Sequence, residues 1–460
     1  MTGRQPTMYV RDYDRRVAEL LQGFEALPLD APVRLGKPTS NLFRPRTGAT
    51  ARLNVSEFSG VIEVSRANAT ADVLGMTTYE DLVDATLPHG YMPKVVPQLR
   101  TITIGGTVTG LGIESTSFRN GCPHESVLEM DILTADGGVV TARPDNEHRD
   151  LFFGFPNSYG SLGYALRLRI ELERVLPYVE LRHERLSDVG SFITRLTEVS
   201  LAGQSGGAGV DFVDGVMFGA DELYITTGRF VADAPYTSDY TGQQIYYRSI
   251  QQREVDYLTI NDYLWRWDTD WFWCSAALGV QNSKISRLIP KRYLRSDTYW
   301  RVVNFARRRG LIDTLADVRR QPHAEPIVQD VEIPSDRAAE FLTYFNDSIG
   351  ITPVWLCPLK QRDPGVRWEL YQLDPDTVYH NVGFWSSKVL PDGEADGYWN
   401  RQIESKVSEL GGRKSLYSTA FYNEDEFWTI YNGAVYNVLK KSYDPESRFP
   451  NLYDKTVGRR

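Results

Sequence analysis

Residues 37–43 and residues 96–115 are the two segments whose residue types suggest ligand binding. The first, KPTSNLF, places Lys37 beside hydroxyl groups and an amide in a segment rich in turn formers. Backbone N–H groups and hydroxyls in such a loop can bind a pyrophosphate, and the lysine can offset its negative charge. By themselves the same residues also suit an ordinary solvated turn, so both interpretations stay open.

The second segment, VPQLRTITIGGTVTGLGIES, has four glycines within eight residues of an otherwise β-type pattern. Glycine lets a backbone approach a ligand closely, and the threonines and serine can supply hydroxyl partners. Glycine-rich strand ends also occur as bulges, so a ligand site and a bulge are both possible. The run Gly110 to Ser115 lacks the third glycine of the Rossmann fingerprint, and no Walker A sequence occurs.

The histidines and cysteines do not suggest a metal centre. None of the six histidines forms an HxH or HxxxH pair, and the three cysteines lie far apart. His124 lies close to Cys122 and could be a ligand or a base, although loop packing is the simpler interpretation. Unpaired cysteines suit a reducing cytosol.

Length and composition indicate a globular protein of two or three domains, or one large composite fold. The chain has 460 residues, of which 42% are hydrophobic and 24% charged, and its net charge is −9. That charge argues against a surface that binds the nucleic-acid backbone. The first residues lack the apolar stretch of a signal peptide, and no segment has the length and apolarity of a membrane span. We therefore expect a soluble protein or one that lies on a membrane surface.

Hydrophobic periodicity predicts a mixture of helices and strands, and so an α+β fold. The spacing predicts helices over residues 9–26, over 78–86 with Thr77 or Thr78 as the cap, and over 425–443, and it predicts strands over 61–64, 71–74, 101–104 and much of 127–175. Between residues 257 and 273, four tryptophans alternate with charged residues. This alternation fits a half-buried strand, or an interfacial surface, because indole rings favour the lipid headgroup region.

In this order the segments resemble the FAD domain of the vanillyl-alcohol oxidase superfamily, the PCMH-type fold. The chain is most similar to the Δ24-sterol reductase branch, including actinobacterial reductases of methylene-branched fatty acyl chains in 10-methylstearate (tuberculostearate) biosynthesis. The resemblance rests on GGTVTGLGIESTSFRNG, LTADGGVVTARPDNEHRDLFFGFPNSYGSLGY, VWLCP, YNEDEFWTIYNG and FPNLYDK. It implies an FAD-binding domain with an N-terminal helix over residues 1–180, an inserted α+β substrate (cap) domain over 181–400 and a closing segment over 401–460.

The resemblance also implies which residues bind FAD. The pyrophosphate loop would be Lys37, Pro38, Thr39, Ser40, Asn41, Leu42 and Phe43. The rest of the pocket would be Gln98, Thr101, Ile102, Gly105, Gly106, Thr109, Gly110, Gly112, Ser115, Tyr159, Gly160, Leu162 and Gly163. Many relatives attach the flavin through a His or Cys, yet the loop has neither. We therefore expect non-covalent FAD, and colour that stays with the denatured protein would contradict this.

Three residues are candidates for the catalytic acid. Some members of the superfamily have a lysine in the segment matching LYSTAFY at 416–422, but here the segment has only apolar and hydroxyl groups. Tyr417 and Tyr422 are the candidate proton donors in it, although buried tyrosines are often structural. Glu332 is the third candidate, with Asp330 beside it. Residues two apart on a strand face the same side, so both carboxyls could point into one cavity. A raised carboxyl pKa would suit general acid catalysis, whereas a solvated strand face is the alternative.

The activity that the resemblance implies is FAD-dependent reduction of an unactivated C=C bond in a lipid. The substrate would be a methylene-branched phospholipid acyl chain. NADPH would reduce the flavin, whose N5 delivers hydride to one alkene carbon while an acid protonates the other. A partner SAM-dependent methyltransferase would make the methylene intermediate. The protein would be cytoplasmic, with peripheral contact to the inner face of the plasma membrane through the tryptophan segment.

Three other functions stay open. They are a Δ24-sterol or isoprenoid side-chain reductase, a flavin-dependent alcohol oxidase or dehydrogenase, and a non-catalytic lipid-binding scaffold for a methyltransferase.

Overall fold

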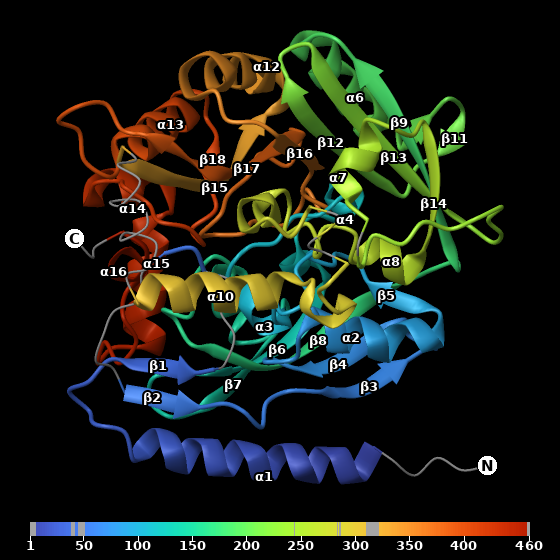
Figure 1. Ribbon diagram of the computed structural model, residues 1–460. Helices are drawn as coiled ribbons and strands as arrows, with labels where there is room; N and C mark the ends of the chain where they lie inside the picture. The colour runs from blue at the N-terminus through green and yellow to red at the C-terminus, as the bar shows by residue number, and fades with distance from the viewer. Residues whose placement is uncertain are drawn as a thin grey trace.

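Two antiparallel β-sheets form the body of the protein in the computed structural model (Figure 1). Residues 61–174 supply the first sheet and residues 178–414 the second, and we call the parts of the chain before and after residue 175 its two halves. The structure describes residues 6–37, 42–44, 51–242, 244–282, 284, 287–309 and 322–457. In Figure 1 the sheet of the first half lies in the lower part of the molecule and the sheet of the second half in the upper part. The fold is therefore α+β, as the sequence predicts.

The first sheet has the strand order β3-β4-β8-β6-β7, and β5 also pairs with β8. Its strands are β3 (Val61–Ser65), β4 (Thr70–Leu74), β5 (Tyr91–Pro93), β6 (Val127–Leu133), β7 (Val139–Ala142) and β8 (Tyr164–Arg174). The helices of this half are α1 (Pro6–Glu25), α2 (Tyr79–Thr86), α3 (Ile104–Thr109), α4 (Ser117–Asn120) and α5 (Arg149–Gly154). A parallel pair, β1 (Val33–Gly36) and β2 (Ala51–Asn54), lies beside α1.

The second sheet has eight strands in the order β14-β9-β13-β12-β16-β17-β15-β18. They are β9 (Tyr178–Leu186), β12 (Phe212–Gly219), β13 (Glu222–Val231), β14 (Val255–Thr259), β15 (Ala324–Pro334), β16 (Val354–Leu359), β17 (Tyr379–Val389) and β18 (Arg413–Lys414). Helices α6 (Val189–Ala202), α12 (Ser335–Tyr344) and α13 (Tyr398–Glu409) pack on it. Helices α14 (Glu424–Ile430), α15 (Gly433–Tyr443) and α16 (Leu452–Thr456) return to the first half, where α15 packs on α5 (Figure 1).

Helix α2 begins where the sequence predicts. The Thr78 hydroxyl accepts a hydrogen bond from the backbone N–H of Asp81 at 3.2 Å, which satisfies a donor that the first helical turn leaves unpaired. Glu80 and Asp81 lie in this turn, where acidic side chains suit the positive end of the helix dipole. Thr78, rather than Thr77, is therefore the cap.

The predicted strand over residues 101–104 is wrong. A turn leads instead into α3, and the Thr103 hydroxyl accepts from the backbone N–H of Gly106 at 3.3 Å to cap this helix. Ile104 and Val108, one helical turn apart, are buried in the core. The tertiary packing of this face overrides the β preference of the isoleucines, threonines and valine.

The single helix predicted over residues 425–443 is two helices, α14 and α15. The break lies at Asn432, whose φ of 54° is left-handed. Its side chain accepts from the backbone N–H of Val435 at 3.4 Å and so caps α15. Asparagine tolerates this conformation because its short side chain can bond locally, and the chain changes direction there.

The tryptophan segment is neither a half-buried strand nor an interfacial surface. After β14 it forms the short helix α8 (Ile260–Leu264) and then a series of turns. Trp265 and Trp267 are fully buried, and Trp271 and Trp273 are almost so. The charged residues between them find buried partners, which the local sequence cannot reveal. Contact of these tryptophans with a membrane surface is therefore excluded in this conformation.

The change from one sheet to the other falls between Arg174 and Tyr178, while β18 of the second sheet lies beyond residue 400. The proposed domain boundaries at 180 and 400 stay predictions. Within the described residues, no helix combines the length and the apolar character that a bilayer crossing requires.

A buried ionic cluster joins the two halves. The Arg266 guanidinium is 1% exposed and pairs through Nη2 with Asp214 Oδ2 of β12 at 2.9 Å and with Glu114 Oε1 at 3.4 Å. It also lies 4.0 Å from the centre of the Tyr263 ring, whose hydroxyl is 2.8 Å from Ser115 Oγ. Residues just after α3 are thereby fixed to the second sheet.

We expect Arg266→Met to lower the free energy of unfolding by about 3–5 kcal/mol, because it leaves two carboxyls buried without their cation. The measurement is urea unfolding of the wild type and the variant. The matched control is Arg182→Met, whose side chain is 61% exposed in its pair with Glu180 and whose loss should cost no more than about 1 kcal/mol. Equal effects of the two substitutions would contradict the structural role of Arg266.

Candidate active site

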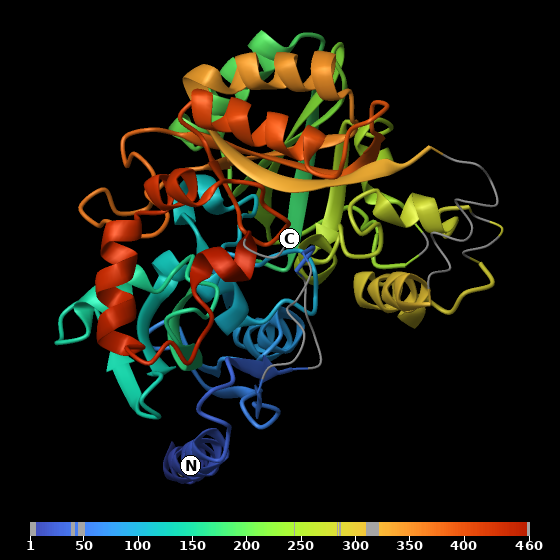
Figure 2. The ribbon, with the colours of Figure 1, turned by 90° about the vertical axis from the view of Figure 1, so that its left-hand side faces the viewer.

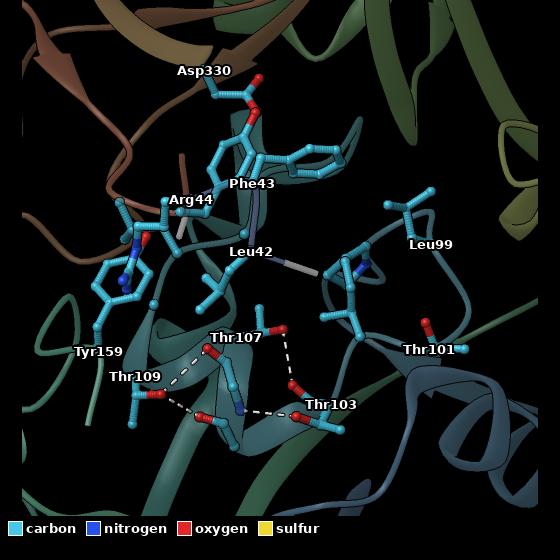
Figure 3. A pocket seen from close by; sticks show the side chains of 18 of the residues that line it. Leu42, Phe43, Arg44, Leu99, Thr101, Thr103, Thr107, Thr109, Tyr159 and Asp330 are labelled. Carbon is cyan, nitrogen blue, oxygen red and sulfur yellow. Dashed lines mark hydrogen bonds between the residues drawn. The ribbon is translucent and has the colours of Figure 1, made fainter. Parts of the chain in front are cut away.

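A cavity of about 320 Å³ lies where the two halves of the chain meet (Figure 3). The first half contributes the β1–β2 connection, the residues around α3, and the turn before β8. The remainder contributes Trp271, Phe272, Cys274, Asp330, Trp355, Trp385, Tyr417 and Lys455. Both sheets are therefore needed to form the cavity.

Helix α3 forms one wall, and two of its glycines have different roles. A Cβ on Gly105 would lie 2.6 Å from the carbonyl oxygen of Gly75, so this glycine is needed for packing against the end of β4. A Cβ on Gly106 would lie 2.8 Å from the Thr103 hydroxyl oxygen and 3.8 Å from Lys37 Nζ. The ammonium of Lys37 therefore faces the first turn of α3 across the place where a side chain would stand.

At the end of α3 the wall continues at Gly110, which follows the last helical residue and lets the Tyr159 ring pack closely. A Cβ on Gly110 would lie 3.2 Å from the Tyr159 ring, so the ring packs directly on the glycine backbone. Tyr159 itself has a left-handed φ of 49° and is followed by Gly160 at 71°. This turn brings the Tyr159 ring beside α3, as Figure 3 shows.

The charges of the cavity are separated. Four cationic residues of the lining are Arg34, Lys37, Arg44 and Lys455. The carboxylate of the lining, Asp330, lies on the opposite side from Thr103 and Thr109 (Figure 3). This arrangement suits a ligand with an anionic part near α3 and a neutral part near Asp330.

Gln98 gives a direct test of whether a polar ligand fits. Its side chain is 4% exposed and lines the cavity, yet its Nε2 has no hydrogen-bond partner among the residues that the structure describes. A buried amide without a partner is costly, so a bound group that accepts from it would lower the free energy. The open glycine backbone, the cations and this amide together fit an extended dinucleotide such as FAD.

Asp330 and Tyr417 form a pair in the far wall. Asp330 accepts a hydrogen bond from Asn381 Nδ2 at 3.0 Å and interacts with the Tyr417 hydroxyl. Burial raises the pKa of Asp330 to about 6. Burial and the nearby Asp330 hold the pKa of Tyr417 well above its usual value, and Trp385 Nε1 donates to the Tyr417 oxygen at 3.0 Å.

Most residues implied by the resemblance line this one cavity, and some do not. Those that do are Lys37, Leu42, Phe43, Gln98, Thr101, Ile102, Gly105, Gly106, Thr109, Gly110, Gly112, Tyr159, Gly160 and Tyr417. Pro38, Thr39, Ser40 and Asn41 lie outside the described residues. Ser115, Leu162, Gly163, Glu332 and Tyr422 are buried elsewhere, so their predicted roles in binding or catalysis stay predictions.

The positions of the two other acid candidates differ from that of Tyr417. Glu332 shares the face of β15 with Asp330, as predicted, but it bonds to Tyr371 and accepts from Ser415 Oγ at 3.2 Å, behind the cavity wall. Tyr422 packs 6.2 Å from the ring of Tyr431, between ring centres. Neither residue lines the cavity.

Sequence reasoning did not find several lining residues. Trp271, Phe272, Trp355 and Trp385 form an aromatic wall, and Arg44 and Lys455 supply charge. Trp355 and Lys455 lie in segments that carried the resemblance, VWLCP and FPNLYDK. The others reach the cavity only because the fold brings distant segments together, which no local pattern reveals.

The group Cys122, His124 and Glu125 has its potential ligand atoms within 4.8 Å of one another. Both carboxylate oxygens of Glu125 are already used, since Oε1 accepts from the Cys122 N–H at 2.8 Å and Oε2 from the Arg362 N–H at 2.7 Å. The His124 ring packs edge-on against Trp368. These contacts favour the loop-packing interpretation of His124.

Comparison with known proteins supports the cofactor. Residues 33–143 match the family model described as FAD binding domain. Over 384 residues the chain is 27% identical to Delta(24)-sterol reductase of Rattus norvegicus, covering 80% of this chain and 70% of the relative. Over 444 residues it is 25% identical to Delta(24)-sterol reductase of Arabidopsis thaliana, covering 88% and 76%. Cytokinin dehydrogenase 6 of Oryza sativa subsp. japonica is 36% identical over 160 residues, which is 34% of this chain and 30% of the relative.

The matched range includes Lys37 and all of α3, so the wall described above belongs to the FAD-binding domain. The match supports FAD as the cofactor, and the similarities support the predicted superfamily and its sterol reductase branch. The closer resemblance to reductases of methylene-branched acyl chains stays a prediction.

We expect Gly106→Val to weaken FAD binding by roughly ten- to a hundredfold or more, because its side chain occupies the space between α3 and Lys37. FAD titration of the folded protein measures this, with circular dichroism as the check of folding. The control is Gly209→Val, since a Cβ on Gly209 meets nothing within 4 Å. Full flavin occupancy in folded Gly106→Val would show that the cofactor lies elsewhere.

Proposed function

We propose that this chain, an FAD-dependent oxidoreductase that acts on a C=C bond, reduces an isolated alkene in a methylene-branched phospholipid acyl chain, with NADPH as the reductant. The observation that carries the proposal is one acid pair, Asp330 and Tyr417, set in a mostly aromatic wall opposite α3. Such a wall suits a hydrocarbon, and such a pair suits protonation of one alkene carbon.

The apolar character of this wall supports a lipid substrate. An unactivated alkene has no group that accepts a strong hydrogen bond, so it is recognised by shape and by apolar contact. The Phe272 ring stacks on Trp385 at 4.3 Å between centres and lies 5.6 Å from Trp355. These contacts hold the rings in fixed orientations, so they can position a hydrocarbon chain and exclude water.

Tyr417 is the proposed proton donor and Asp330 the residue that replaces its proton. When Asp330 is protonated, the Tyr417 oxygen can accept from Asp330 and from Trp385 Nε1 together, which leaves the phenolic hydrogen free to point into the cavity. When Asp330 is ionised, the same hydrogen turns to the carboxylate. The protonated form of Asp330 is therefore the active one.

The reaction balances with these groups. FAD held against α3 would supply, once reduced by NADPH, the hydride for one alkene carbon. Tyr417 gives its proton to the other carbon, and the Asp330 proton passes to the Tyr417 oxygen, so no tyrosinate is left in a buried site. Solvent then reprotonates Asp330. The product has gained a hydrogen pair, and NADPH has lost a hydride.

A sterol or isoprenoid side chain is the second candidate substrate. The relatives named Delta(24)-sterol reductase support it, since the alignments reach most of both chains. Both candidate substrates place an isolated alkene in an apolar cavity, so the reaction is the same for both. They differ in the shape of the hydrocarbon that the aromatic wall must accommodate.

The acyl substrate requires a preceding reaction. A SAM-dependent methyltransferase that adds a carbon to an unsaturated chain is the proposed source of the methylene branch. All three cysteines are free thiols, which suits a cytoplasmic protein.

The experiment incubates the FAD-loaded protein anaerobically with NADPH and phospholipid that carries a methylene-branched chain, and follows the acyl mass. We expect gain of a hydrogen pair together with loss of NADPH. A parallel reaction with a Δ24-unsaturated sterol distinguishes the two substrates, and turnover of the sterol alone would contradict the acyl assignment. Oxygen consumption with an alcohol, or a flavin that NADPH never reduces, would contradict alkene reduction.

We expect Tyr417→Phe to slow reoxidation of the reduced flavin by the alkene by roughly 10²–10⁴-fold while leaving FAD binding unchanged. In the wild type this rate should fall as pH rises through about 6, because the pKa of Asp330 lies near that value and its protonated form is the active one. Asp330→Asn should be slow at every pH and lose this dependence. Anaerobic stopped-flow absorbance measures the rate.

Tyr422→Phe is the matched control, because it removes another buried hydroxyl from the same segment, outside the cavity lining. Its rate should equal that of the wild type. If Tyr422→Phe were slow and Tyr417→Phe reacted at the wild-type rate, the proton donor would be Tyr422 and the proposal would be wrong.

A further inference from the structure

The segment from residue 284 to residue 309 has a charge opposite to that of the whole chain. It contains nine Lys and Arg residues and one acidic residue, Asp297, whereas the chain has a net charge of −9. The segment leads into α10 (Ser296–Arg308) and includes the whole helix. A segment with this excess of basic residues in an acidic protein suggests an anionic partner.

The same segment also exposes large apolar side chains. Leu288 is 84% exposed, Phe305 57% and Val302 54%, and Tyr293 is also exposed. Single exposed apolar residues are common, but several within one short segment rich in cations indicate a contact surface. Cations and apolar groups in one segment are what a surface that rests on an anionic bilayer requires.

Two aromatic rings of this segment, Tyr293 and Phe305, each lie against an arginine side chain. The Arg292 guanidinium lies 4.9 Å from the centre of the Tyr293 ring, and that of Arg309 lies 5.1 Å from the Phe305 ring. Long basic side chains can keep their charge at lipid headgroups while their apolar stems and a neighbouring ring reach deeper. We call Leu288, Arg292, Tyr293, Arg301, Val302, Phe305 and Arg309 the basic apolar face.

The faces of α10 have separate roles. Arg301, Phe305 and Arg309 are one turn apart in succession, so they lie on one side of the helix. Trp300, on another side, lies 4.9 Å from Phe43 and 5.9 Å from Trp271, between ring centres. Both of these rings line the cavity. The helix therefore separates the cavity wall from the outside surface.

The start of α10 is fixed to the body of the protein. Arg295 Nη2 pairs with Glu80 Oε2 of α2 at 2.5 Å, and Ser296 Oγ donates to Asp268 Oδ1 at 2.5 Å. Figure 2 shows α10 at the edge of the molecule, away from the cores of both sheets. A flat surface can therefore reach it.

We propose that the basic apolar face docks this protein on an anionic lipid bilayer. Charge complementarity selects the bilayer, and the exposed apolar side chains add the contact that a purely electrostatic partner such as nucleic acid would leave unused. Docking does not depend on the reaction, but the use of this face for substrate entry rests on the proposed function. An acyl chain could then reach the cavity beside Trp300 without crossing water.

The test is sedimentation of the FAD-loaded full chain with vesicles of phosphatidylglycerol and phosphatidylcholine, compared with vesicles of phosphatidylcholine alone. We expect binding to the anionic vesicles that falls steeply as salt is raised. Arg292→Glu with Arg309→Glu should weaken it by roughly fivefold or more per residue. Val302→Ser with Phe305→Ser should also weaken it, and this loss should persist at low salt.

Helix α15 offers matched controls, since it presents the exposed pair Val438 and Lys441 on the other side of the molecule. Val438→Ser and Lys441→Glu should leave vesicle binding unchanged. Flavin content should equal that of the wild type in every variant, which excludes misfolding as the cause of a loss.

Absence of binding to anionic vesicles, or equal losses in the α15 controls, would overturn the proposal. Binding to DNA or to heparin without binding to vesicles would also overturn it. The outcome is independent of the proposed function, because reduction of a detergent-solubilised alkene can be measured on the same variants. Loss of docking with normal reduction in detergent supports the role of this face.

Discussion

The burial of Arg266 is the constraint on which the site depends. An arginine with so little contact to water must have its charge matched, and Asp214 and Glu114 do this from different halves of the chain. Their positions fix the residues after α3 relative to β12. Because the cavity takes one wall from each half, this fixed relation sets the distance between the cofactor wall and the acid pair.

The second constraint is the separation of charge inside the cavity. The cations lie on the side of the β1–β2 connection and the C-terminal segment, where an anionic pyrophosphate is expected. The hydrogen-bonding groups beside Asp330 are the neutral side chains of Asn381 and Tyr417, so burial can raise the pKa of Asp330. A cation beside Asp330 would lower this pKa and remove the proton. The same cavity can thus bind an anion and retain an acid.

Part of the fold and of the site could be predicted from the sequence, where the structure depends on interactions between residues close together in the chain. Thr78 caps α2 through a neighbour three residues away, and Asp330 and Glu332 share a face because strand side chains alternate. Residues 101–104 look like a strand, but Gly105 packs on Gly75 and Ile104 enters the core, so the chain turns into α3. Packing between residues far apart in the sequence determines the helix here, and the local sequence pattern carries no information about that packing.

The aromatic residues show the same limit. Trp265 and Trp267 look suited to a membrane surface, yet they are buried because Arg266, between them, finds partners far away in the sequence. The positive charge of residues 284–309 can be read from the sequence, but the outward side of α10 follows only from the contact of Trp300 with Phe43.

The central claim is that one alkene carbon receives hydrogen from the flavin and the other from the protein. The most direct measurement is the anaerobic reaction with unlabelled NADPH in deuterated water, started by adding NADPH to the FAD-loaded protein and lipid and followed by mass spectrometry that locates the label on each carbon. The account predicts deuterium in every product molecule on the carbon that is protonated from Tyr417, whereas the other carbon carries deuterium only to the extent that the flavin N5–H has exchanged with solvent. A product with no solvent deuterium, or an alkene left unchanged while the flavin stays reduced, would contradict it.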